Sequence, residues 1–170
     1  KDAQKAAGRY GEYSHCYLLN KILWGKSKRL KLNHRRLKFR FVGSQHTNVP
    51  DGVREESFPD LWDAHPRAYL RLLSAAKLLE VQAFAARAVA LRHPEILKQA
   101  TIDELLGMLA QSHPQTVGLA AEELETRYDP DDPDLGTLDR LLRDERERIQ
   151  KIAHAWLERP AEKLPGHRVL

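Results

Sequence analysis

The 170-residue chain has little cysteine and no long apolar run. Cys16 is its single cysteine, so no disulfide and no cysteine-based zinc site can form within the chain. No apolar stretch approaches the roughly 20 residues that a membrane-spanning helix needs, and no signal peptide is visible. We therefore expect a cytoplasmic protein that lies in a reducing environment and does not enter a membrane.

The chain also lacks the common catalytic and metal-binding motifs. It has no Gly-x-Ser-x-Gly, no phosphate-binding loop and no glycine-rich dinucleotide fingerprint. No pair of histidines has the HExxH spacing, and the acidic residues 129–134 do not fit a helix–loop–helix calcium loop. We expect no cofactor, no metal, no small-molecule substrate and no catalysis. Because the chain begins at Lys1 and contains one Met, we expect it to be part of a longer protein, and an enzyme elsewhere in that protein is left open.

Positive charge is concentrated in the first third of the chain. Residues 1–49 contain 12 Lys or Arg against Asp2 and Glu12, which gives a net charge of +10. Because the whole chain has a net charge of +4, residues 50–170 have a net charge of −6. Concentrating like charges costs self-repulsion. This division therefore favours a basic surface that meets a polyanion or an acidic partner.

A helix followed by a β-hairpin is predicted for this basic part. Residues 3–24 show helical periodicity, and Gly25 marks the expected end of the helix. Apolar and basic residues then alternate in residues 29–32 and 37–41, with a loop at 33–36 between them. The alternation predicts an apolar face, packed against the helix, that comprises Leu30, Leu32, Leu37, Phe39 and Phe41, and a basic face that comprises Lys31, Lys38 and Arg40.

The segment from Lys26 to Arg40 is the strongest functional candidate, since eight of its fifteen residues are Lys or Arg and none is acidic. Such a run can neutralise several phosphates with little sequence specificity. No aromatic residue stands on the basic face, which disfavours a platform for stacking single-stranded bases. An acidic protein surface, the acidic half of this chain, or a solvated face without a partner are the alternatives. The candidate nucleic-acid-binding residues are Lys26, Lys28, Arg29, Lys31, Arg35, Arg36, Lys38 and Arg40.

The rest of the chain is predicted to be a linker and a helical part. Residues 1–49 form the basic arm, residues 50–65 the linker and residues 66–170 the helical repeats. Within the linker, residues 58–62 are expected to form a short turn that closes the end of the helical part.

Three segments of the helical part align with one another: residues 81–89, 117–125 and 149–157. Apolar residues fall at positions one, four, five and eight of each, which is one face of a helix, and position five is always Ala. A short amphipathic run precedes each segment, at residues 69–73, 105–109 and 138–142. Helix starts are indicated by the capping-box spacing of Thr101 and Glu104 and by Pro66, Pro94, Pro114 and Pro133. Paired helices repeated in this way indicate an α-solenoid.

Residues 81–89, Val-Gln-Ala-Phe-Ala-Ala-Arg-Ala-Val, resemble the second helix of the HEAT repeat, which typically has Val-Arg-x-x-Ala-Ala-x-Ala-Leu. Gln82 replaces the basic residue, and Glu125 stands where the second copy should be apolar. The resemblance covers residues 66–160 and implies a right-handed stack of helical hairpins, an architecture that mostly serves as a binding scaffold. Residues 58–63 with His65 and Pro66 also resemble a junction in bacterial proteins of unknown function that combine HEAT-like repeats with a WGR domain.

Together these patterns predict a mainly α protein, a short HEAT-like α-solenoid preceded by a helix and a basic β-hairpin. The predicted function is a non-catalytic binding or scaffold module that contacts nucleic-acid backbone through its basic arm. The alternative is a protein–protein interaction scaffold whose arm docks on an acidic partner. We also expect a protein partner for the helical part.

Overall fold

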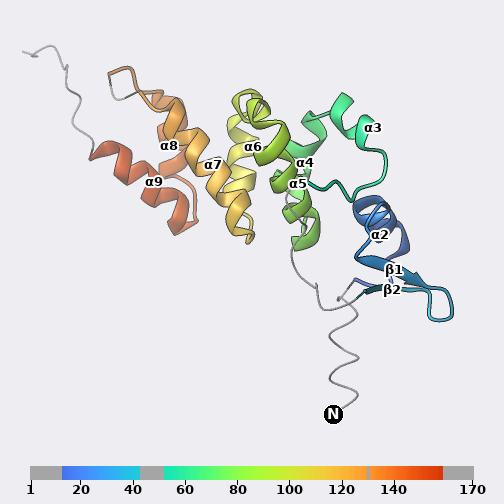
Figure 1. Cartoon of the computed structure of the whole chain (residues 1–170). Helices are drawn as coiled ribbons and strands as arrows, with labels where there is room; N and C mark the ends of the chain where they lie inside the picture. The colour runs from blue at the N-terminus through green and yellow to red at the C-terminus, as the bar shows by residue number, and fades with distance from the viewer. Residues whose placement is uncertain (1–12, 43–51, 130, 159–170) are drawn as a thin grey trace, which may run out of the picture. The chain divides into compact units, whose positions relative to one another are not determined.

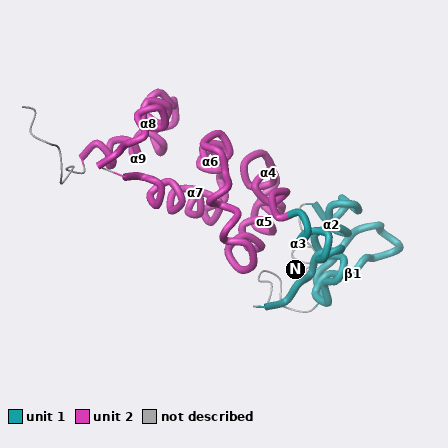
Figure 2. The backbone as a smooth tube through the Cα atoms, turned by 90° about the horizontal axis from the view of Figure 1, so that it is seen from above, with its two compact units in different colours: residues 1–65 teal, residues 66–170 magenta. Residues whose placement is uncertain are grey.

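The computed structural model describes residues 13–42, 52–129 and 131–158, and over these ranges the chain is mainly helical. Their regular structure consists of eight α-helices, one 3₁₀-helix and one two-stranded sheet (Figure 1). The chain divides into two compact units, residues 1–65 and residues 66–170 (Figure 2). None of the helices in the described ranges combines the length and the apolarity that crossing a bilayer requires.

The first helix of the described ranges is shorter than its periodicity predicts. α2 spans Tyr17–Trp24, and residues 13–16 ahead of it form a turn. The turn is held in place because the Ser14 carbonyl accepts a 2.8 Å hydrogen bond from the Phe39 amide of the hairpin. The side-chain amide of Asn20 also donates to two backbone carbonyls of the turn. The prediction of a continuous helix is therefore wrong over residues 13–16, and its part over residues 3–12 lies outside the described residues.

α2 ends at the predicted glycine for a reason of close packing. A Cβ on Gly25 would lie 2.0 Å from the Ser57 Oγ. Ser57 occupies this space because its hydroxyl donates to the Lys21 carbonyl at 2.7 Å and its amide donates to the Ile22 carbonyl at 2.8 Å. The segment that contains Ser57 thus packs against the end of α2 at Gly25, which has no side chain to prevent this contact.

The hairpin forms as predicted. β1 (Leu30–Asn33) and β2 (Lys38–Phe41) pair antiparallel, with Leu30 opposite Phe41 and Leu32 opposite Phe39. Leu30 and Phe39 are buried, and the Phe39 ring centroid lies 5.9 Å from that of Tyr17 in α2. The apolar face therefore packs on the helix, as the alternation predicts.

Leu37 departs from this pattern, and its predicted place on the apolar face is wrong. It has a φ of +49°, in the left-handed region, and its side chain is exposed. The cause is Asn33, whose carbonyl accepts from the Arg36 amide and whose Oδ1 accepts from the Arg35 and Arg36 amides. Hairpin loops of this kind commonly place one left-handed residue after the turn, before strand pairing resumes. Leu37 takes that position.

Residues 52–65 are an integral part of the first unit. Glu55 and Glu56 are each 4% exposed, and the Glu55 carbonyl accepts a 2.8 Å hydrogen bond from the Lys26 amide. The sequence predicts a short turn at residues 58–62, but α3 spans Pro59–Ala64, so most of them lie in a helix. The remainder of the predicted linker, residues 50 and 51, lies outside the described residues.

The second unit contains three consecutive helix pairs. Their members are α4 (Arg67–Ala75) with α5 (Leu79–Arg92), α6 (Ile102–Leu109) with α7 (Pro114–Arg127), and α8 (Leu135–Leu142) with α9 (Glu147–Leu157). The helices of each pair pack together, α4 also packs on α6, and α5 on α7. The 3₁₀-helix η1 (Pro94–Gln99) packs against α4, α5 and α7, and the third pair meets α6 through α9. All six helical segments predicted for this part lie within these helices.

The three aligned segments are equivalent in burial at some positions and not at others. The first position is fully buried at Ile149 but only half-buried at Val81 and Val117. In α5 the adjacent Gln82 is buried, and its Nε2 donates to the Oε1 of Gln111 at 2.7 Å. The eighth position is buried in all three segments, at Ala88, Leu124 and Trp156.

Several of the helix starts are fixed by the residues that predicted them. Thr101 and Glu104 form a complete capping box, and Pro114 is the first residue of α7. In the acidic cluster, the Asp134 carboxylate caps α8 by accepting from the Gly136 and Thr137 amides. The hydroxyl and amide of Thr137 lower the pKa of Asp134, which keeps this cap charged.

Candidate nucleic-acid interface

Seven of the eight candidate residues are exposed on the hairpin and on the segment that leads into it. We call them the cationic surface: Lys26, Lys28, Lys31, Arg35, Arg36, Lys38 and Arg40. None of these side chains forms an ion pair or a hydrogen bond with any residue in the ranges that the structure describes. Their charge is thus available to a partner.

The strand register brings like charges together on this surface. Lys31 lies directly opposite Arg40, and Lys38 precedes Arg40 by two residues on the same face of β2. Directly opposed residues have their Cβ atoms about 5 Å apart, and a like-charged pair there destabilises a sheet. An anion that lies across β1 and β2 would remove this repulsion, so the hairpin gains stability when such an anion binds.

Three described acidic residues of the first unit, Glu55, Glu56 and Asp63, are paired with arginines outside the cationic surface. Arg54 pairs with Glu56 and with Asp63 of α3. Arg29 pairs with Glu55. These two arginines therefore neutralise carboxylates that would otherwise offset the cationic surface.

Arg29 is the candidate residue that does not reach the surface. It is 8% exposed, and its guanidinium donates from Nε to Glu55 Oε1 at 2.8 Å and from Nη2 to Glu55 Oε2 at 2.6 Å. The hydrogen bonds to Glu55 raise the pKa of Arg29. Because its charge is paired with Glu55 inside the unit, Arg29 positions the hairpin and is not part of the cationic surface.

Ser27 completes this internal contact. Its hydroxyl donates to Glu55 Oε1 at 2.8 Å and accepts from the amides of Arg29 and Leu30, at 3.1 and 3.2 Å. The start of β1 is thereby fixed to the segment that follows the hairpin. Sequence reasoning missed Ser27 and Glu55, because no local pattern links residues that lie 28 positions apart.

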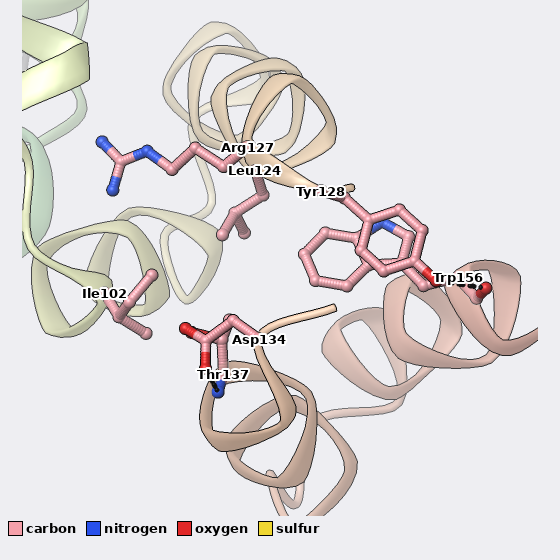
Figure 3. Close-up of a pocket in the computed structure, with 7 residues that line it drawn as sticks. All are labelled: Ile102, Leu124, Arg127, Tyr128, Asp134, Thr137 and Trp156. Carbon is pink, nitrogen blue, oxygen red and sulfur yellow. Dashed lines mark hydrogen bonds between the residues drawn. The ribbon is translucent and has the colours of Figure 1, made fainter. Parts of the chain in front are cut away.

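The second unit has a pocket of about 280 Å³ between α7, α8 and α9 (Figure 3). One wall is the Tyr128 ring stacked on Trp156, with ring centroids 4.4 Å apart. The lining residues are Ile102, Leu124, Arg127, Tyr128, Asp134, Thr137 and Trp156.

The polar side chains of this pocket are used in structural hydrogen bonds. Arg127 donates to the carbonyls of Leu97 and Ala100, and the Tyr128 hydroxyl donates to the Trp156 carbonyl. Asp134 accepts from the hydroxyl of Thr137 at 2.6 Å. These hydrogen bonds give the polar side chains of the pocket a structural role.

In the described ranges, no three or more His, Cys, Asp or Glu side chains are arranged to hold a metal ion. His113 serves as the N-cap of α7, where its ring Nδ1 accepts from the Thr116 amide.

Comparison with known proteins yields no family model, no curated protein and no solved structure that matches this chain. The resemblance to HEAT repeats therefore stays a prediction from the sequence.

Proposed function

We propose that this chain is a binding module that contacts the sugar-phosphate backbone of duplex nucleic acid through its cationic surface. The observation that carries the proposal is a set of seven exposed cations, on the hairpin and the segment that leads into it, whose side chains have no acidic partner among the described residues. The position of Lys31 directly opposite Arg40 also supports the proposal. Two like charges placed opposite each other destabilise the hairpin, and a bound anion between them would remove this repulsion.

The size of the hairpin suits a short stretch of duplex. A strand of four residues is roughly 14 Å long, which corresponds to about four base-pair steps. The fixed cations of the strands and loop are Lys31, Arg35, Arg36, Lys38 and Arg40. If each neutralises one phosphate, binding is strong at low salt, falls steeply with salt, and depends little on sequence.

For the second unit we propose a short HEAT-like solenoid that docks a protein partner or connects the hairpin to neighbouring domains. The three successive helix pairs, and the burial of the eighth aligned position in each second helix, support this architecture. Solenoid units contact mainly their neighbours along the chain, and α4 with α6 and α5 with α7 follow that rule.

Two triple variants with the same change in charge test the proposal. The first carries Lys31→Gln, Lys38→Gln and Arg40→Gln on the strands. The control carries Arg71→Gln, Lys77→Gln and Lys98→Gln, which are exposed cations of the second unit. Binding of each protein to a 30-base-pair duplex of arbitrary sequence is measured by fluorescence anisotropy at 0.1 M salt.

Loss of three phosphate contacts at this salt concentration should weaken binding by about 10²–10³-fold in the strand variant. The control should bind like the wild type. Equal losses in both variants would show that net charge alone matters and would refute the hairpin as the interface. If the wild type binds no duplex but its strand face is needed to bind an acidic protein, the scaffold alternative replaces the proposal.

A further inference from the structure

The Asn33 turn accounts for the backbone of Leu37, but it does not require an apolar side chain at this position of the hairpin loop. Leu37 is 68% exposed, so its side chain contributes little burial. Its φ of +49° is unfavourable for any residue other than glycine, asparagine or aspartate. Leucine at this position therefore costs the hairpin stability through backbone strain, and burial of its side chain offsets little of that cost.

The neighbours of Leu37 in the sequence are cationic. Arg35 and Arg36 precede it in the loop and Lys38 follows it at the start of β2, and all three are exposed. The loop projects beyond the strands and α2 within the first unit (Figure 1). An apolar side chain in a projecting cationic loop can be brought to a polyanion together with the arginines of that loop.

Such a combination has a known physical use in duplex DNA. Apolar side chains can insert between base pairs from the minor groove and kink the duplex, while arginines beside them enter the negative potential of a narrow minor groove. We infer that Leu37 is a wedge of this kind, which inserts between base pairs of duplex DNA and bends it, with Arg35 and Arg36 in the groove beside it. Leu37 can act in this way only on a bound duplex, so the inference rests on the proposed function.

The same geometry discriminates DNA from RNA. The minor groove of A-form RNA is wide and shallow, and it offers neither the narrow groove that favours arginine nor the same access between base pairs. Flexible pyrimidine–purine steps such as TA open most easily, so a duplex with a central TA step should be bent more than one with a stiff A-tract there.

Bending is measured by energy transfer between dyes at the two ends of a 30-base-pair DNA duplex with a central TA step. Binding of the wild type should raise the transfer efficiency. Leu37→Ala should leave the efficiency at the value of free DNA while the dependence of binding on salt is unchanged, because the cations remain. Leu37→Asn should also abolish bending while it relieves the strained backbone, so loss of bending in both variants cannot be attributed to unfolding.

Leu61→Ala is the matched control, since Leu61 is 61% exposed on α3 of the same unit. It should bend DNA like the wild type. The inference is overturned if Leu37→Ala bends DNA like the wild type, if the wild type binds without bending, or if an RNA duplex of the same sequence is bent equally. If the wild type binds neither duplex, the proposed function fails as well, whereas binding without bending leaves that function in place.

Discussion

Replacement of Glu55 by Ala tests whether the buried Arg29–Glu55 pair holds the hairpin in place. Both residues are buried, at 8% and 4% exposure, and the guanidinium makes two direct hydrogen bonds to the carboxylate. Removing one partner of such a pair leaves an uncompensated buried charge and costs about 3–5 kcal/mol. A domain has only about 5–15 kcal/mol of stability in total. Glu55→Ala should therefore lower the free energy of opening the hairpin by a large fraction of the first unit's total stability.

Hydrogen exchange followed by mass spectrometry measures this opening locally. A loss of about 3 kcal/mol corresponds to roughly 10²-fold faster exchange, and we expect it in peptides that contain β1 and β2. The double variant Arg29→Met with Glu55→Leu should restore much of the protection, because an apolar pair of similar volume avoids the buried charge.

The control is Asp139→Ala, which breaks an exposed ion pair with Arg143 in the second unit. Exposed pairs of this kind add little to stability. If Glu55→Ala changes hairpin exchange no more than Asp139→Ala changes that of α8, the pair does not hold the hairpin and the reasoning is refuted.

Two further predictions concern α2 and α7. Gly25→Ala should lower the unfolding free energy of the first unit by about 1–3 kcal/mol, because the new Cβ would lie 2.0 Å from the Ser57 Oγ. Urea unfolding measures this free energy, and a variant as stable as the wild type would contradict the prediction. Burial lowers the pKa of His113, so the unfolded state binds more protons and the second unit should lose stability as pH falls below about 6.5. His113→Asn keeps an acceptor for the Thr116 amide, and it should reduce the change in melting temperature between pH 7.5 and 5.5. An unchanged pH dependence would show that His113 is not its source.

Local patterns sufficed for most of the regular structure. Strict alternation predicts the hairpin and its faces, because side chains on a strand point alternately to two sides. The capping box at Thr101 and the proline before α7 mark helix starts through contacts within one turn. These signals succeed because all their partners lie within a few residues.

The errors occur where a distant partner decides the local structure. Arg29 belongs to the same basic run as its neighbours, yet Glu55, 26 residues away, draws it inside. The turn at residues 13–16 interrupts a helical pattern because its Ser14 carbonyl accepts from the Phe39 amide of β2. Leu37 fits the apolar alternation, but the Asn33 side chain closes the loop so that Leu37 falls outside the strand.

The most direct test of the central claim is the salt dependence of duplex binding by the wild-type chain. With five to seven phosphates neutralised by the cationic surface, a plot of log binding constant against log salt concentration should have a slope of about −4.5 to −6.3 between 50 and 200 mM. A slope near zero, or no binding at 50 mM, would contradict the assignment of the hairpin as a nucleic-acid interface.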